Sequence, residues 1–168
     1  ILMVINAQAS SKDYCPIQPT WSNVYSISPQ VSADITEIEG NTFMLQGNVE
    51  IFVLGNVIKA KEANILKDSI DYSGFAKAGS FSNDRIKISY DYLTIQDSGA
   101  EISATNGTMQ INGNPLGLSF ETLQKVDDAI ELKEVVMSSC INNPGGWQIN
   151  GGKIEISENG RGNIYDMQ

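Results

Sequence analysis

The sequence of 168 residues contains no histidine. Histidine is the usual general base near neutral pH and a frequent zinc ligand, so its absence excludes His-dependent triads and most zinc sites. No glycine-rich loop has the spacing of a phosphate-binding motif that opens a helix. The carboxylates that could be imagined as a catalytic pair, Glu62, Asp68, Asp71 and Asp91, read as solvated turn and strand-edge residues. We therefore expect no enzymatic activity, no cofactor and no metal.

Basic residues are few and scattered. The chain has 11 Lys and Arg against 20 Asp and Glu, a net charge of −9. The densest basic stretch is the mixed triplet Lys59-Ala60-Lys61. Binding to a phosphate backbone requires clustered positive charge, so we expect no nucleic-acid partner.

Long apolar runs are also missing, since no segment approaches the roughly 18 apolar residues of a membrane-spanning helix. The most apolar stretch, residues 1–9 (ILMVINAQA), ends in the small-x-small pattern of a signal-peptidase site. We interpret it as the remnant of a signal peptide that is cut short at its start, and hence expect export from the cytoplasm. The alternative is a buried first strand.

Cysteine occurs only at Cys15 and Cys140. The two are too far apart for a CxxC redox or zinc motif, and they fit an oxidising compartment if they are paired. A bridge between them would close a long loop and contribute about 4–5 kcal/mol on the chain-entropy model. Two free thiols, or bonds to cysteines of another segment, remain alternatives.

Alternating apolar and polar residues dominate the rest of the chain. Residues 10–30 are polar, carry Cys15 and three of the prolines, and are expected to form a tether. From Val31 onward strands are predicted, most clearly where Ile86, Ile88 and Tyr90 alternate with polar residues. The inward parity slips by one residue between Ala60 and Ala63, which predicts a bulge or a turn there.

Turn signals separate these runs at short spacing. They are Gly40-Asn41, Gly55-Asn56, Gly74, Gly79, Ser98-Gly99, Asn106-Gly107, 113–115, Asp127-Asp128, 144–146 and Gly151-Gly152. Many short strands with regular turns predict one all-β domain over residues 31–168, in the form of a sandwich, roll or solenoid. Residues 59–69 and 121–136 have a helix-compatible composition, but the parity of their flanks favours strands.

If one parity of each strand faces inward, the apolar side chains form a trough between sheets. Sheet interiors normally pack shut, and that is the alternative. Small inward residues such as Ala60, Ala63 and Ala104 would leave room for a guest. An acyl chain in such a trough would gain about 0.8 kcal/mol per buried methylene, whereas a surface ion pair contributes about 0–1 kcal/mol.

Several of these segments resemble the OstA-like β-jellyroll family of lipopolysaccharide-transport proteins. The similarity lies in residues 47–51 (GNVEI), Ala60, Ala63 and 76–79 (AKAG). Segments of the second half are similar to the periplasmic domain of the LptD-type outer-membrane assembly branch: 107–111 (GTMQI), 138–140 (SSC), 147–149 (WQI) and 160–162 (GRG). The position of Cys15 also fits that branch. The chain departs from it at Tyr90, where a small residue is usual, and in having no barrel strands after Gln168.

The resemblance implies a twisted β-jellyroll of short antiparallel strands with an open apolar interior. It also implies a place at the periplasmic face of the outer membrane. Lipopolysaccharide would arrive from an LptA-like periplasmic bridge protein stacked edge to edge on the roll, and pass to a barrel with an LptE-like lipoprotein plug. Cys15 and Cys140 would form disulfides with barrel cysteines. The alternatives are a free-standing bridge protein and, from another class, a β-solenoid adhesin or structural protein.

The residues expected to contact acyl chains are the large apolar side chains of inward parity. They are Phe43, Leu45, Val49, Ile51, Val53, Ile58, Ile65, Ile86, Ile88, Ile102, Met109, Ile111, Leu118 and Phe120.

Overall fold

The computed structural model describes residues 30–69, 71–139, 147–157 and 161–167. Within these ranges most residues lie in strands. The elements are β1 (Gln30–Ser32), β2 (Ile35–Glu39), β3 (Thr42–Val53), β4 (Asn56–Asp68), β5 (Asp71–Ser82), β6 (Ile86–Gln96), the 3₁₀ turn η1 (Asp97–Gly99), β7 (Glu101–Ile111), β8 (Gly117–Val126), β9 (Ala129–Ser138), β10 (Gln148–Ser157) and β11 (Gly162–Met167).

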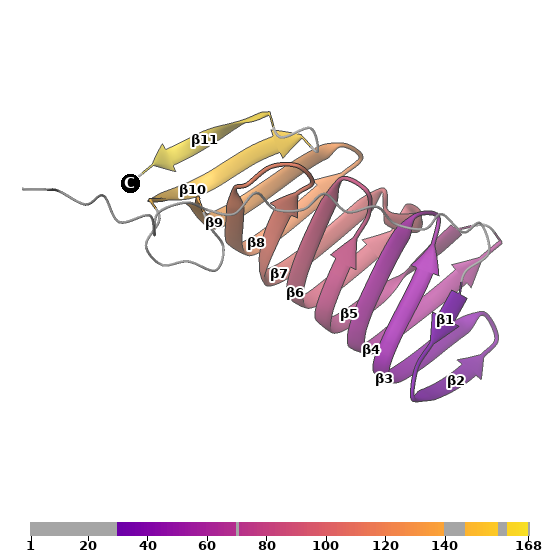
Figure 1. Ribbon diagram of the computed structural model, residues 1–168. Helices are drawn as coiled ribbons and strands as arrows, with labels where there is room; N and C mark the ends of the chain where they lie inside the picture. Colours follow the sequence, from indigo (N-terminus) through magenta and orange to yellow (C-terminus); the bar gives the residue numbers. More distant parts are fainter. Residues whose placement is uncertain (1–29, 70, 140–146, 158–160, 168) are drawn as a thin grey trace, which may run out of the picture.

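All the strands belong to one antiparallel sheet, in which neighbours in sequence are neighbours in space from β3 to β11 (Figure 1). The order runs from β1 through β3 and on to β11, and β2 also pairs with β3. The predicted all-β, jellyroll-like class is confirmed. The two windows with helix-compatible composition are strands, in β4 and in the β8–β9 hairpin.

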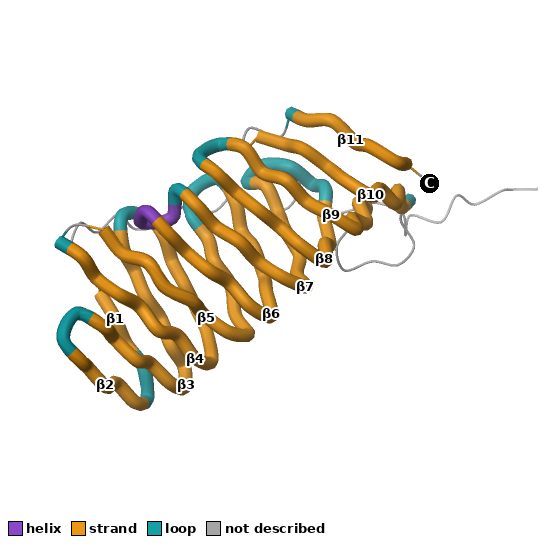
Figure 2. Tube along the Cα trace, turned by 180° about the vertical axis from the view of Figure 1, so that it is seen from behind, coloured by secondary structure: helices purple, strands orange, loops and turns teal. Residues whose placement is uncertain are grey.

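The long strands bend sharply in the middle, so that the sheet folds over on itself into two facing layers (Figures 1 and 2). The bends coincide with residues of left-handed backbone conformation inside alternate strands. These are Asn48 in β3, Ala78 in β5, Asn106 in β7 and Glu134 in β9; Asp166, one residue from the end of the short strand β11, shares this conformation. Residues of this kind rarely occur within regular strands, because a left-handed backbone brings Cβ against a carbonyl oxygen. We call the line through these positions the crease.

The hydrogen-bonded pairing between neighbouring strands is also interrupted along the crease. The β3–β4 register shifts between Gln46 and Val49, the signature of a β-bulge. The predicted slip of parity between Ala60 and Ala63 lies on this line and is therefore confirmed as a bulge. The left-handed positions recur at intervals of about 30 residues, one per hairpin.

The crease divides the sheet into two half-sheets. Half-sheet A ends in the turns at 54–55, 83–85 and 112–116, which form rim A. Half-sheet B ends in the turns at 40–41, 97–100 and 127–128, which form rim B. Because the sheet is folded over, the two rims face each other across the open side of the roll, which we call the mouth.

Several glycines predicted to mark turns between strands lie inside strands instead. Gly74 and Gly79 belong to β5, Asn106-Gly107 to β7 and Gly151-Gly152 to β10. At Gly107, a Cβ would meet the Ser89 carbonyl oxygen and lie 2.8 Å from Cζ of Phe120. Glycine there permits close approach of strands at the crease. The strands are consequently longer than the short ones that the turn signals predicted.

The edge of the sheet formed by β1 and β2 is also interrupted at the crease. β1 pairs with half-sheet A of β3, and β2 pairs with half-sheet B of β3. At the break between them, the Asp34 backbone N–H donates to the Gly47 carbonyl (2.8 Å), and its carboxylate accepts from the Asn48 side chain (2.9 Å). β1 and β2 thus act as one strand broken at the crease. Gln30, the last residue of the predicted tether and the first described residue, pairs with Phe52.

Apolar side chains of one parity fill the space between the half-sheets and form one core cluster. The outer surface carries cross-strand ion pairs such as Lys59–Glu50 (2.7 Å) and Lys77–Glu62 (2.9 Å). In the part of the chain that the structure describes, no helix is of a length and hydropathy that would let it cross a bilayer.

Candidate functional site

An apolar cavity of about 200 Å³ lies between the half-sheets at the β1–β5 end of the roll. Its walls come from both layers, because β1 and the end of β3 belong to half-sheet A while the start of β3 and the end of β4 belong to half-sheet B. The lining residues are Val31, Phe43, Leu45, Ile51, Val53, Ile65, Lys67 and Tyr72. The volume exceeds the roughly 150 Å³ of an engineered apolar cavity that binds benzene. We call it the N-terminal cavity.

Two polar groups border this cavity. Lys67 contributes to the lining at the rim B end of β4 and is exposed. The hydroxyl of Tyr72 accepts a hydrogen bond from the Asn56 side-chain amide (3.2 Å). Burial raises the pKa of Tyr72 to about 12, and the bond from Asn56 opposes this rise. The phenol therefore stays neutral, and the cavity wall beside it carries no negative charge.

A second apolar cavity, of about 100 Å³, lies between the half-sheets at the other end of the roll. We call it the C-terminal cavity. It is lined by Ile111, Asn114, Leu116, Leu118, Met137, Ile154, Ile156, Gly162 and Ile164. Like the first, it combines side chains of both half-sheets, and its lining is almost wholly aliphatic.

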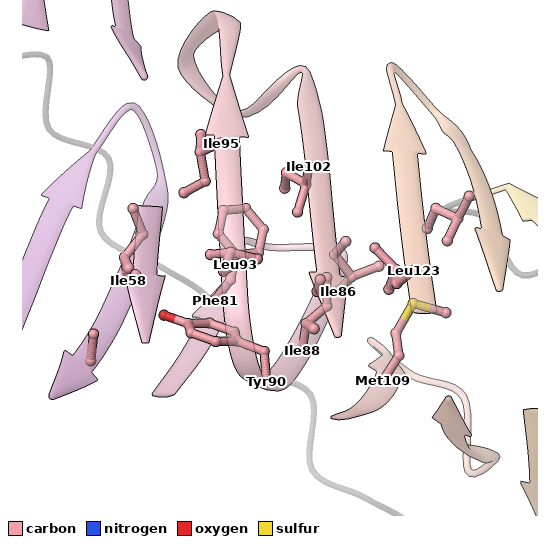
Figure 3. Packing of buried hydrophobic residues seen from close by; sticks show 14 of the residues in the cluster. Ile58, Phe81, Ile86, Ile88, Tyr90, Leu93, Ile95, Ile102, Met109 and Leu123 are labelled. Atoms are coloured by element: carbon pink, nitrogen blue, oxygen red, sulfur yellow. The ribbon is translucent and has the colours of Figure 1, made fainter. Parts of the chain in front are cut away.

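Between the two cavities the interior is closed by the protein's own side chains (Figure 3). Phe81, Ile88 and Leu93 are 0% exposed. Tyr90 is also buried, which raises the pKa of its phenol, and its hydroxyl donates to the Lys59 carbonyl (2.9 Å). The apolar interior therefore differs from the single continuous trough that the sequence predicted. It has room at each end and a packed middle.

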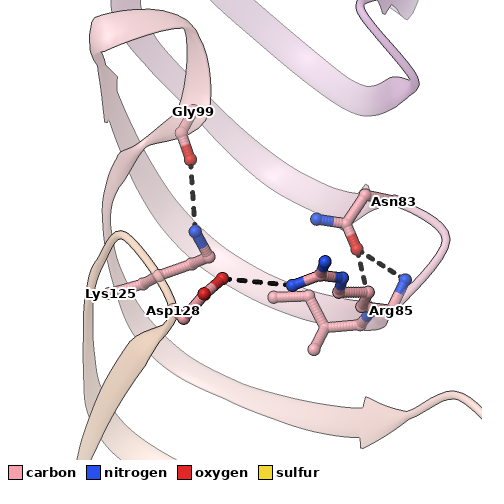
Figure 4. A network of polar contacts seen from close by, with 6 residues as sticks. Asn83, Arg85, Gly99, Lys125 and Asp128 are labelled. Atoms are coloured by element: carbon pink, nitrogen blue, oxygen red, sulfur yellow. Dashed lines mark hydrogen bonds and ion pairs between the residues drawn. The ribbon is translucent and has the colours of Figure 1, made fainter. Parts of the chain in front are cut away.

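Polar contacts join the rims across the mouth. Asn56 of rim A reaches Tyr72 and also donates to the Ser98 carbonyl of rim B (3.4 Å). Further along, the Arg85 guanidinium of the β5–β6 loop donates to Asp128 of the β8–β9 turn at 3.1 Å (Figure 4).

The structure brings together all of the residues predicted to contact acyl chains. Thirteen are buried in the core and Phe43 packs against it. Phe43, Leu45, Ile51, Val53 and Ile65 line the N-terminal cavity, and Ile111 and Leu118 line the C-terminal one. The remainder lie in the closed interior: Val49, Ile58, Ile86, Ile88, Ile102, Met109 and Phe120. Their contact with lipid stays a prediction.

Tyr72 and Lys67 line the N-terminal cavity and Met137 lines the C-terminal cavity, although none of the three was predicted as a site residue. Tyr72 and Ala76 share the inward parity of β5, but Gly74 between them hides the alternation. Lys67 has the same inward parity as Ala63 and Ile65 in β4. Because its side chain is charged, it did not count as part of an apolar alternation.

The structure offers little for other chemistry. No three His, Cys, Asp or Glu side chains come together as a metal site among the described residues. Of the carboxylates considered above, Glu62 pairs with Lys77 on the outer surface, and Asp71 accepts from the Ser98 hydroxyl (3.2 Å). Cys15 and Cys140 lie outside the described residues.

Comparison with known proteins adds no relative: neither the protein-family models nor the curated protein sequences give a match. The resemblance to OstA-like proteins consequently rests on the segments quoted in the sequence analysis.

Proposed function

We propose that this chain is a lipid-transfer module that shelters the acyl chains of lipopolysaccharide between its half-sheets. The observation that carries the proposal is the N-terminal cavity, an apolar space of about 200 Å³ bounded by both layers. Apolar burial stabilises a bound hydrocarbon chain without any specific polar contact. The net charge of −9 does not oppose this, because the tails are inside while an anionic head group remains in water.

The resemblance supplies the biological setting of the proposal. The module would work at the periplasmic face of the outer membrane, receive lipopolysaccharide from a bridge protein and pass it to a barrel with a lipoprotein plug. Two apolar side chains exposed at the β1–β2 edge adjoin the N-terminal cavity: Val31 lines it, and Ile38 pairs with the lining residue Phe43. An incoming chain would meet apolar surface before it reaches the cavity. The antiparallel order of successive strands argues against the β-solenoid alternative, whose coils stack in parallel.

A matched pair of phenylalanines tests the proposal. Phe43 lines the N-terminal cavity, whereas Phe75 lies on the outer surface, stacked on Tyr92 with ring centroids 5.7 Å apart. Each is replaced in turn by a benzophenone-bearing phenylalanine in the full chain, which is irradiated with lipopolysaccharide. We expect adducts at position 43 and none at 75.

A second set extends the test to half-sheet A. Ile51 lines the same cavity and Lys87 is exposed on the outer surface. Capture at 51 and not at 87 is the expected result. Equal capture at inner and outer positions, or none at positions 43 and 51, would overturn the proposed function.

A further inference from the structure

The closed middle of the roll leaves no space for a chain to pass from one cavity to the other. Ile58, Phe81 and Ile88, which are neighbours in half-sheet A, are 0% exposed, and so is Leu93 of half-sheet B (Figure 3). Interiors of this density do not admit a methylene chain without moving. If the proposed function holds, the two half-sheets have to separate for a chain to occupy the middle.

The crease provides a line about which they can separate. On each side of it the strand ladders are continuous: β6 pairs with β7 from Ile86 to Ser89, and again from Tyr92 to Gln96. Tyr90 and Asp91, between these stretches, are unpaired with β7 in the ladder. A change of angle along this line therefore leaves the pairing within each half-sheet intact. Bulges of this kind are where strands bend.

At the mouth, opposite the crease, side-chain contacts join the two half-sheets. At the β4–β5 end, Asn56 bridges the mouth to Tyr72 and to the Ser98 carbonyl. The Ser98 hydroxyl in turn accepts from the Tyr72 backbone N–H (3.2 Å) and donates to Asp71, which fixes this part of rim B. Further along, Arg85 pairs with Asp128, and both side chains are more than half exposed, at 53% and 78%.

The Arg85 loop is held to the neighbouring 112–116 turn of rim A. The Asn112 backbone N–H donates to the Arg85 carbonyl (2.7 Å), and the Asn83 side chain accepts from the backbone N–H groups of Arg85 and Ile86. Figure 4 shows the contacts of the Asn83 side chain, with Asp128 approaching Arg85 from the β8–β9 turn. The contact thus joins two well-placed turns across the mouth. An ion pair of this exposure contributes little stability, so it can break and reform readily.

We propose that the mouth is a lateral gate. The Asn56–Tyr72–Ser98 and Arg85–Asp128 contacts hold it closed, and the half-sheets part about the crease to admit an acyl chain sideways. This inference rests on the proposed function. The entering chain takes over the apolar contacts that the two layers lose on parting, so the hydrophobic surface exposed by opening is covered again.

The test joins the two rims covalently. Arg85→Cys and Asp128→Cys are combined in the full chain, with Cys15 and Cys140 replaced by serine. A reducible bis-maleimide then links the pair. Uptake of cis-parinaric acid, a fluorescent fatty acid, is followed by stopped flow before and after the linker is cleaved. Because closure of loops or domains gates access to a site, we expect linked protein to take up the probe about tenfold more slowly or worse, and cleavage to restore the rate.

A matched control carries the same linker within one half-sheet. Lys87 and Gln110 face each other across β6 and β7, and linking Lys87→Cys to Gln110→Cys should leave the uptake rate unchanged. If the linked mouth takes up the probe as fast as the cleaved one, the gate is overturned while the proposed function stands. If protein with an unlinked mouth takes up no probe, the proposed function fails and the gate with it.

A milder variant opens one contact without a linker. Tyr72→Phe removes the hydroxyl that receives the Asn56 bond and keeps the ring in the core. Uptake should become about twofold to tenfold faster, the effect of one hydrogen bond. If the uptake rate is unchanged in this variant and also in the linked protein, neither the Asn56–Tyr72–Ser98 contact nor the Arg85–Asp128 contact controls entry, and the gate is overturned.

Discussion

The side-chain amide of Asn56, in half-sheet A, donates a 3.2 Å hydrogen bond to the hydroxyl of Tyr72, in half-sheet B. Strands β4 and β5 are neighbours, yet these two residues lie at opposite ends of the paired segment and meet only because the sheet is folded. The contact therefore exists only while the two half-sheets face each other, and its loss can be followed through the titration of the Tyr72 phenol.

Replacement of Asn56 by alanine should raise the pKa of Tyr72 above its value of about 12, because the bond from Asn56 is the interaction that lowers it. The measurement is a difference titration of tyrosinate absorbance, with Tyr72→Phe as the reference that identifies the signal. A pKa that falls toward 10 would show that the variant has opened the site to water instead.

Stability should decrease in alkaline solution as a consequence of the same pKa. The folded-state pKa of Tyr72 lies above the ordinary value of 10.0, so the folded protein holds this proton more tightly than the unfolded chain. Its contribution is complete below pH 10 and is lost as the pH rises toward about 12. Urea unfolding at a series of pH values should show this slope, and Tyr72→Phe should flatten it. Because the pKa of Tyr90 is raised in the same direction, a residual slope is expected in that variant.

The packed middle should depend strongly on Phe81. Its ring is 0% exposed, and Phe81→Ala is expected to lower the free energy of unfolding by about 3–5 kcal/mol. Phe75→Ala removes the same ring from the outer surface, where it stacks on Tyr92, and should cost about 0.5–1.5 kcal/mol. Chemical denaturation of both variants checks the difference. Equal losses would contradict a sealed interior.

A glycine at the crease should stabilise the protein, which is the reverse of the usual effect within a strand. Ala78 has a φ of +49°, a conformation that costs an L-residue about 1–2 kcal/mol and glycine almost nothing. Ala78→Gly should therefore raise the free energy of unfolding by about 1 kcal/mol. Ala129 is equally exposed but lies in ordinary strand conformation, and Ala129→Gly should lower it by about 0.5–1 kcal/mol. Thermal melting should show a higher melting temperature for Ala78→Gly and a lower one for Ala129→Gly than for the parent protein.

On the outer surface, Lys153 lies between Glu131 (2.9 Å) and Glu155 (2.7 Å). Hydrogen bonds from Lys153 are the main cause of the lowered pKa values of both carboxyls. Lowered carboxyl pKa values stabilise the fold above the pKa of the unfolded chain, and this contribution disappears as the pH falls. Lys153→Gln should raise both pKa values in an NMR titration and weaken the loss of stability in acid. High salt should reduce the difference between variant and parent, and a difference that is insensitive to salt would argue against the ion pairs.

The alternation of apolar residues was sufficient to predict strands and their inward faces. Ile86, Ile88 and Tyr90 illustrate this, because a half-buried strand buries every second side chain. The slip between Ala60 and Ala63 also marked the crease, since the bulge shifts which parity faces inward. Both signals are local, and local patterns survive in the folded chain.

The positions of most bends were not predictable, because their signals are inconsistent from strand to strand. Asn106-Gly107 has turn chemistry and was therefore interpreted as a turn between two strands. Ala78 and Glu134 adopt the same left-handed conformation with no such chemistry, so tertiary packing imposes it on them. The packed middle was hidden for a different reason: inward parity identifies which side chains face each other, but not how closely the two layers approach.

Because one bend falls in every hairpin, at nearly equal spacing along the chain, the architecture is extensible. A hairpin inserted between β6 and β7 would bring its own bend into line with those on either side and lengthen the roll without disturbing its cross-section. Shortening a strand by a few residues on one side of the bend would instead leave its neighbours misaligned. The length of the module can thus change by whole hairpins, while its width is fixed.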